Sequence, residues 1–97
     1  MNYFYKQPSE VFVIAVDFVQ RLATGETITS KTVTAIELKH NADKTSTVID
    51  SFTIDGTAID IKVKAGTDGI SYKITIKAVT SGSNTLEEEV IMYVVEE

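Results

Sequence analysis

The amino-acid sequence predicts an all-β fold, an antiparallel β-sandwich of about seven strands that takes up residues 1–97 as a single domain. Composition is the first observation, because 43 of the 97 residues are β-branched or aromatic and suit a pleated, half-buried surface. Only three residues are leucine, too few to fill the core of a helical bundle. The second observation is spacing, since short apolar runs recur at intervals of about 8–12 residues with turn residues between them.

The expected strands comprise residues 3–6, 11–18, 32–39, 46–54, 57–64, 70–80 and 86–95. The first is an edge or lead-in strand because Pro8 ends it. The second is apolar on both faces, so we predict that it is central or covered. Residues 19–23 are the one stretch that could form a helical turn. Asp17, at the end of the second strand, is expected to cap the turn after Phe18, or to pair with Arg21.

The middle of the chain alternates less regularly. The strand at 32–39 slips in phase between Val33/Ala35 and Ile36/Leu38, which predicts a bulge. Residues 40–44 read as a polar loop, and Asp55-Gly56 is a strong turn signal after the strand at 46–54. The strands at 57–64 and 70–80 then alternate cleanly between apolar and polar side chains.

The last two strands are expected to form a hairpin with a five-residue loop at Ser81–Thr85. Pairing Thr80 with Leu86 places Lys77 opposite Glu89, an opposite-charge pair that supports this register. A Gly- and Asp-rich corner at 65–69 precedes Tyr72, an arrangement typical of the tyrosine corner of immunoglobulin-like domains. In such a corner the ring packs in the core and the hydroxyl bonds an upstream backbone group; a plain core tyrosine is the alternative.

Composition argues against an enzyme. The chain has no Cys, and its single histidine, His40, enters a loop with no nucleophile elbow nearby. The net charge of −5 argues against nucleic-acid binding, and the apolar run 11–16 is far too short to cross a membrane. We therefore expect no catalytic residues, no cofactor, no nucleic-acid partner and no membrane partner.

A calcium site is also not expected. Calcium takes about six to eight oxygen ligands that converge on one point. The four candidate aspartates are spread over strands and two different turns: Asp50, Asp55, Asp60 and Asp68. Asp55 and Asp68 each precede a glycine, so both are more simply explained as turn residues.

The C-terminal strand is the strongest candidate for a binding site. Six consecutive apolar residues, 90–95, lie between the acidic runs 87–89 and 96–97, so both faces of the strand are apolar. One face can fill the core, whereas the other must be covered by the N-terminal aromatic segment or form an exposed interface. The flanking acids act either as gatekeepers against edge pairing or as a rim that selects the partner. The candidate interface residues are Tyr3, Tyr5, Ile91, Tyr93 and Val95.

Two stretches resemble a known family. The first is the strand at 10–18, EVFVIAVDF, followed by Leu22, the segment Gly25–Ile28 and Ser30. The second is the corner and strand at 65–75, followed by 87–94. Together they resemble small phage structural proteins with an immunoglobulin-like fold, of the tail, fibre–tail adaptor or head–tail accessory type. That family usually has Trp where this chain has Phe18.

The resemblance implies a structural role without enzymatic activity. We expect a virion protein, assembled in the host bacterial cytoplasm, that binds other phage structural proteins and could include further copies of itself. The loops at 23–30, 55–56 and 81–84 would be free to contact a neighbour. The alternative is a carbohydrate- or surface-binding immunoglobulin-like module of a larger cell-surface protein, which the absence of Trp disfavours.

No signal peptide is visible at the N-terminus. The chain begins with Met and is expected to be a complete product, with a domain excised from a larger protein as the competing explanation.

Overall fold

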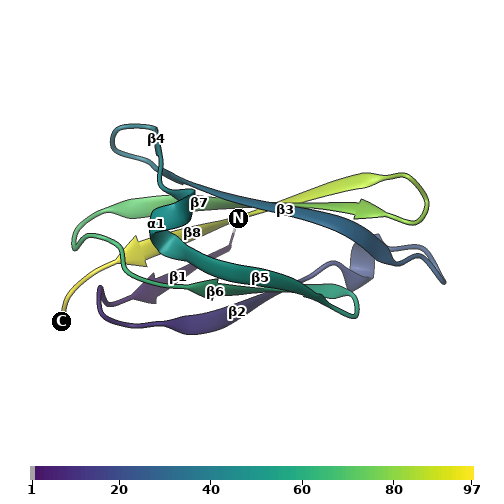
Figure 1. The fold of residues 1–97 in the computed structure, drawn as a ribbon, viewed down its shortest axis with the longest axis horizontal. Coiled ribbons are helices and arrows are strands. Elements are labelled where there is room, and N and C mark those ends of the chain that lie inside the picture. Colours follow the sequence, from purple (N-terminus) through teal and green to yellow (C-terminus); the bar gives the residue numbers. More distant parts are fainter. Residues whose placement is uncertain (1) are drawn as a thin grey trace.

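The computed structural model describes residues 2–97, which form a two-layered β-sandwich (Figure 1). One sheet has the strand order β1-β8-β7-β3-β4 and the other β2-β6-β5. A short 3₁₀ helix, η1, and a one-turn helix, α1, lie between strands. The elements are β1 (Asn2–Lys6), β2 (Phe12–Asp17), η1 (Val19–Arg21), β3 (Ile28–Glu37), β4 (Ala42–Asp43), α1 (Thr45–Val48), β5 (Ile49–Asp55), β6 (Ala58–Val63), β7 (Ser71–Thr80) and β8 (Thr85–Val94).

The arrangement confirms the predicted all-β sandwich. β2, β6 and β5 take the places of strands B, E and D of an immunoglobulin-type sandwich, and β3, β7 and β8 those of C, F and G. The core lies between the sheets and is filled by alternate residues of each strand. β6 and β7 show this most clearly, since they bury Ile59, Ile61, Val63, Tyr72, Ile74, Ile76 and Ala78.

The bounds of β3 and the position of its register shift differ from the prediction. β3 begins at Ile28, and its register shift lies between Ile28 and Ser30, not between Val33/Ala35 and Ile36/Leu38. The phase slip in the sequence arises because β3 ends at Glu37, so Leu38 lies beyond the strand.

The predictions of a loop at 40–44 and of a strand that begins at residue 46 were also wrong. Ala42 and Asp43 form the two-residue strand β4, and the chain then enters α1 before β5 begins. The Asp43 carboxylate accepts hydrogen bonds from both the Thr45 N–H, at 3.0 Å, and the Thr45 hydroxyl, at 2.6 Å. Such local side-chain bonds give the backbone an alternative to a strand ladder.

The prediction for the second strand was wrong in its position. Within the described chain β2 pairs with β6 alone and therefore lies at the edge of its sheet. Its outer face is open, with Val13 58% exposed, and Val11, just before the strand, is 54% exposed. The apolar residues on this face therefore have no covering layer in the described chain.

The β7–β8 hairpin has the predicted faces but a register that differs by two residues. Lys77 lies opposite Glu87, and Thr75 opposite Glu89. The turn is tighter than expected, because the Thr80 N–H donates to the Asn84 carbonyl at 2.9 Å. A shift of two preserves the inner and outer faces, since side chains alternate with a period of two.

The corner between β6 and β7 brings the chain close to β8. Tyr72 is buried in the core, and its hydroxyl accepts a hydrogen bond of 3.0 Å from the Thr67 N–H. Gly66 has a φ of 98°, and a Cβ added there would lie 2.8 Å from Cγ2 of Val94. Glycine is therefore required at this position both by the backbone conformation and by the contact with β8.

This contact predicts the effect of a single methyl group. We expect Gly66→Ala to lower the free energy of unfolding by about 1–3 kcal/mol, because it adds steric crowding to a strained φ. The measurement is urea-induced unfolding of the purified chain.

Gly25→Ala is the matched control, since Gly25 has a φ of 80° with no atom within 4 Å of the added Cβ. It should therefore cost less than Gly66→Ala. Val94→Ala shortens the side chain that the added Cβ would meet. In the Val94→Ala background, Gly66→Ala should therefore cost less stability than it does in the native chain. Equal losses for the two glycine variants would show that the corner does not need this close approach.

Candidate functional site

The predicted interface residues meet along the edge of the larger sheet. β1 pairs in parallel with β8, which places Tyr3 opposite Ile91 and Tyr5 opposite Tyr93. Val95 lies just beyond β8, and its N–H donates to the Lys6 carbonyl at 3.0 Å. Val95 also lines a shallow groove together with Tyr5. We call the five residues Tyr3, Tyr5, Ile91, Tyr93 and Val95 the tyrosine patch.

The three tyrosines of the patch contact one another. Tyr5 stacks on Tyr93 with ring centroids 5.3 Å apart, and Tyr3 meets both rings edge-on at 5.8–5.9 Å. Such offset-stacked and edge-to-face pairs are the favoured aromatic geometries. The rings therefore hold one another in place on the sheet surface.

The two alternatives for this face each describe part of it. Ile91 is only 8% exposed, so the N-terminal strand covers it within the chain. Tyr3 and Tyr5 remain 62% and 66% exposed, and Val95 is also exposed. The N-terminal strand thus buries the aliphatic part of β8 and presents its own aromatic rings outward.

A buried lysine anchors β1, and the sequence contained no signal for it. The Lys6 ammonium donates hydrogen bonds to the carbonyls of Gln7, Pro8 and Ala65 at 2.8, 3.2 and 2.5 Å. Burial lowers the pKa of Lys6, and the negative charge of Glu10 opposes this shift. The bond to the Ala65 carbonyl ties the end of β1 to the β6–β7 corner and so helps to fix the strand that carries Tyr3 and Tyr5.

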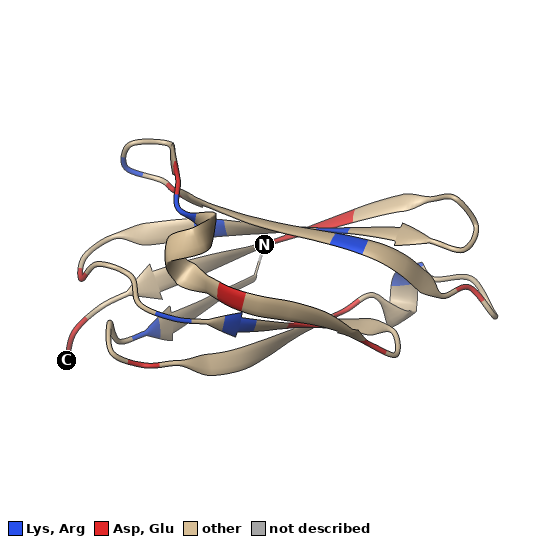
Figure 2. Ribbon diagram, in the orientation of Figure 1, with Lys and Arg blue, Asp and Glu red and all other residues tan. Residues whose placement is uncertain are grey.

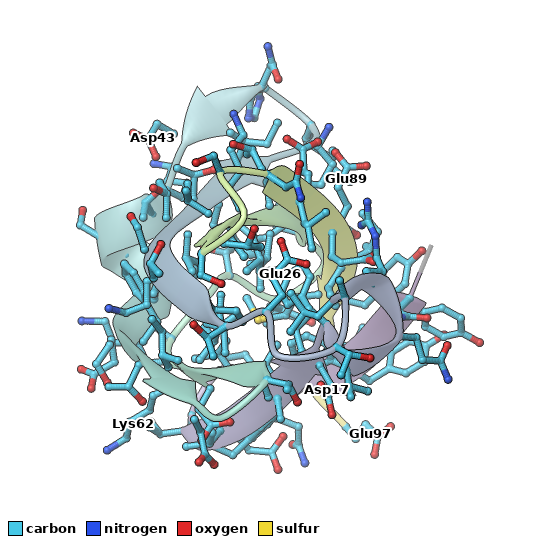
Figure 3. All side chains as sticks on the ribbon, turned by 90° about the vertical axis from the view of Figure 1, so that its right-hand side faces the viewer. Asp17, Glu26, Asp43, Lys62, Glu89 and Glu97 are labelled. Atoms are coloured by element: carbon cyan, nitrogen blue, oxygen red, sulfur yellow. The ribbon has the colours of Figure 1, made fainter. Side chains whose placement is uncertain are left out.

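A second cluster lies where the loops at 23–30, 55–56 and 81–84 come to the same end of the sandwich (Figure 1). Glu26 joins two of them: its carboxylate accepts hydrogen bonds from the Thr80 hydroxyl, from the Asn84 amide at 3.1 Å and from the Ala23 N–H at 2.8 Å. These bonds, that of Thr80 first, lower the pKa of Glu26. Figure 3 views the molecule from this end and labels Glu26.

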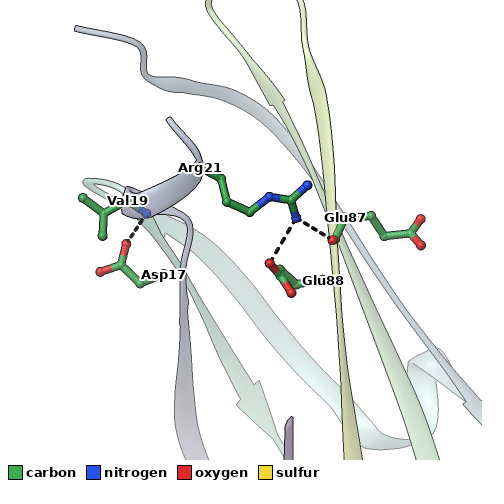
Figure 4. Close-up of polar contacts among 5 residues, drawn as sticks. All are labelled: Asp17, Val19, Arg21, Glu87 and Glu88. Atoms are coloured by element: carbon green, nitrogen blue, oxygen red, sulfur yellow. Dashed lines mark hydrogen bonds and ion pairs between the residues drawn. The ribbon is translucent and has the colours of Figure 1, made fainter. Parts of the chain in front are cut away.

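Asp17 and Arg21 fix the segment that leads into these loops (Figure 4). Asp17 accepts hydrogen bonds from the Val19 N–H at 2.9 Å and the Thr57 hydroxyl at 2.8 Å, which confirms the predicted cap. Arg21 does not pair with Asp17. Its guanidinium instead contacts the Glu88 carboxylate at 3.0 Å and the Glu87 carbonyl at 2.9 Å, and so ties η1 to β8.

Charged side chains are spread over both sheets rather than gathered in one field (Figure 2). His40 contacts Glu37 through Nδ1 and Oε1, 2.5 Å apart. Across residues 2–97, no group of three or more His, Cys, Asp or Glu side chains is arranged to hold a metal ion. Over the same residues, no helix has the length and apolar character needed to span a membrane.

Comparison with known families identifies the family of this chain. The model of the family described as podophage GP4 fiber-tail adaptor protein gp77 matches residues 6–93, so the chain belongs to this family. Membership confirms the resemblance to small phage tail-adaptor proteins, a structural class that is generally non-enzymatic. It favours a phage structural protein over the cell-surface module. No curated protein matches the chain.

The contacts of Glu26 predict a titration in the acid range. Hydrogen bonds to the carboxylate hold its folded pKa below the ordinary value of 4.5. The stability they contribute is therefore present above the unfolded pKa and is lost as the pH falls through the folded pKa. We expect the stability difference between the native chain and Glu26→Gln to shrink between about pH 6 and about pH 3, as measured by urea unfolding.

An NMR titration of the Glu26 side chain checks the cause directly. Its pKa should lie below 4.5, and Thr80→Val should raise it, because the Thr80 hydroxyl donates the most effective hydrogen bond. A pKa of 4.5 or higher in the native chain would show that these bonds do not form in solution.

Proposed function

We propose that this member of the podophage fiber-tail adaptor family is a virion component whose tyrosine patch docks on a neighbouring structural protein of the phage particle. One observation carries the proposal. Tyr3 and Tyr5 are about two-thirds exposed and yet held in place, by the ladder to β8 and by stacking on Tyr93. Rings that are ordered before binding lose little conformational freedom when a partner covers them.

The chemistry of the patch supports a protein partner. Tyrosine combines a large apolar ring with a polar hydroxyl, and it is enriched at protein interfaces for that reason. The patch is bordered on the same sheet by ion pairs between Lys73 and Glu89, at 3.5 Å, and between Lys77 and Glu87, at 3.8 Å. An apolar centre beside charged pairs is the usual layout of a specific interface.

The loops at the other end of the molecule offer a separate contact region. The molecule is 43 Å long and about half as wide. The C-terminal end of β8, with Val95, lies at the opposite end of this length from the β7–β8 hairpin (Figure 1). Glu26 holds the hairpin and the loop at 23–30 together, so this end is also ordered in advance. Two separated surfaces let one small domain contact two neighbours at once.

Charged substitutions in the tyrosine patch test the proposal. Tyr5→Glu and Tyr93→Glu should reduce incorporation into purified phage particles at least tenfold, because each places a carboxylate where the partner buries a ring. Incorporation is measured by quantitative mass spectrometry of particles made with each variant. The midpoint of thermal unfolding should stay close to that of the native chain for Tyr5→Glu, whose side chain is exposed.

Leu38→Glu is the matched control, because Leu38 is an exposed apolar residue outside the patch, at 44% exposure. It should be incorporated like the native chain. Ile91 is unsuitable as a test position because it is buried. The proposal fails if both tyrosine variants are incorporated normally. It also fails if the native chain is absent from intact particles in which other small virion proteins are detected.

A further inference from the structure

We propose that the free edge of β2 is a binding site of its own, which accepts an extended segment of a partner protein as an added β-strand. The segment has alternating apolar residues and is flanked by Lys or Arg. We expect the partner to be a neighbouring virion protein, and this part of the inference rests on the proposed adaptor function. The groove beside this edge shares Tyr3 with the tyrosine patch, whereas the backbone edge of β2 is not part of the patch.

Comparison of the sheet edges singles out β2. Edge strands of soluble proteins are normally blunted by shortness, charge, proline or a bulge. At the other edges of residues 2–97, β4 is two residues long, and β5 has a register shift and carries Asp50 and Asp55. β1 is five residues long, and Pro8 follows it within two residues. β2 pairs with β6 without interruption, and residues 11–16 carry no charge and no proline. In Figure 2 its ribbon is tan over most of its length.

The backbone of β2 has hydrogen-bonding groups directed away from β6. The Phe18 N–H donates to the Thr57 carbonyl at 3.0 Å, on the β6 side. Because N–H and C=O groups alternate in direction along a strand, those of Val13 and Ala15 face the free edge. The Lys64 N–H, just after β6, donates to the Val48 carbonyl on the side of β6 away from β2, which agrees with this alternation.

A groove with both apolar and polar lining runs along the same edge. It has a volume of 320 Å³ and is lined by residues of β1, β2 and β8, including Phe4, Ile14, Val16 and Val90. Ile14 and Val16 pack against the core but stay only partly buried. A strand added to β2 would place its inward side chains in this groove and complete the burial of Ile14 and Val16.

Charge selects the occupant. Glu10 and Asp17 flank the apolar residues of β2, and Asp17 and Glu88 both line the groove. If a second copy paired antiparallel with residues 11–16 aligned, Glu10 of each copy would face Asp17 of the other, and like charges directly opposite are destabilising. Basic residues at both ends of a partner strand would instead meet these carboxylates. A basic-flanked partner segment is therefore favoured over self-association.

A synthetic peptide tests the site without the phage. The probe is Lys-Val-Thr-Val-Thr-Val-Lys, added to the ¹⁵N-labelled full chain. We expect amide shift changes concentrated in β2 and its groove, with slower hydrogen exchange at Val13 and Ala15. The matched peptide with Glu in place of both Lys residues should bind at least tenfold more weakly.

Two edge variants localise the effect. Ala15→Pro removes an N–H that faces the free edge while leaving the ladder to β6, and it should weaken binding at least tenfold. Ala15→Ser, which keeps the N–H, is the control and should bind normally. Should Ala15→Pro fail to fold, Val13→Lys serves instead, because it puts a like charge beside the peptide at an exposed position.

The outcomes separate this inference from the adaptor function. Any of three outcomes would overturn the strand-addition site. The peptide could fail to bind, it could shift amides only outside β2 and its groove, or it could bind normally to a folded edge variant. Shifts in β2 that depend on the concentration of the chain alone, with a dimer mass, would assign the edge to a second copy and overturn the inference too. Tyr5→Glu should bind the peptide normally while failing to enter particles, so the two proposals can fail independently.

Discussion

The alternation of side chains across each strand is the constraint on which the rest of this structure depends. On β6 and β7 the inward residues are β-branched or aromatic apart from Ala78, and the outward ones are mostly polar, so these two strands form the centre of the core. β8 is apolar on both faces near its end, which leaves one apolar face outside the core. Parallel pairing with β1 partly covers that face and creates the tyrosine patch. The same rule leaves Val13 on an open face of β2.

Polar side chains then fix the loops and the terminal strand, whose positions side-chain alternation does not determine. Lys6 ties β1 to the β6–β7 corner, and Glu26 ties the loop after η1 to the β7–β8 hairpin. Arg21 links η1 to β8. Within residues 2–97, no buried side-chain nitrogen or oxygen is left without a hydrogen-bond partner. Buried polar groups that are fully satisfied favour one arrangement over its neighbours, which suits surfaces that must be ordered before a partner arrives.

A domain of this kind suits an adaptor because its surfaces differ in chemistry. The tyrosine patch offers aromatic rings beside paired charges, and the loop end offers polar backbone and side-chain groups. The β2 edge offers unpaired backbone beside a groove of mixed apolar and polar lining. Specificity between neighbours can therefore come from different interactions at each surface. All three proposed binding surfaces rest on order that the sandwich supplies before any partner is bound.

The sequence alone was enough to predict the all-β class and the inner and outer faces of β6, β7 and β8, because each depends on local alternation. The tertiary structure decided where the strands stand in the sheets. It placed β2 at an edge, moved the β7–β8 register by two residues and replaced the start of a predicted strand with α1. It also showed that Lys6 is buried. These features depend on residues far apart in the chain or on competing local hydrogen bonds, which a period of two cannot distinguish.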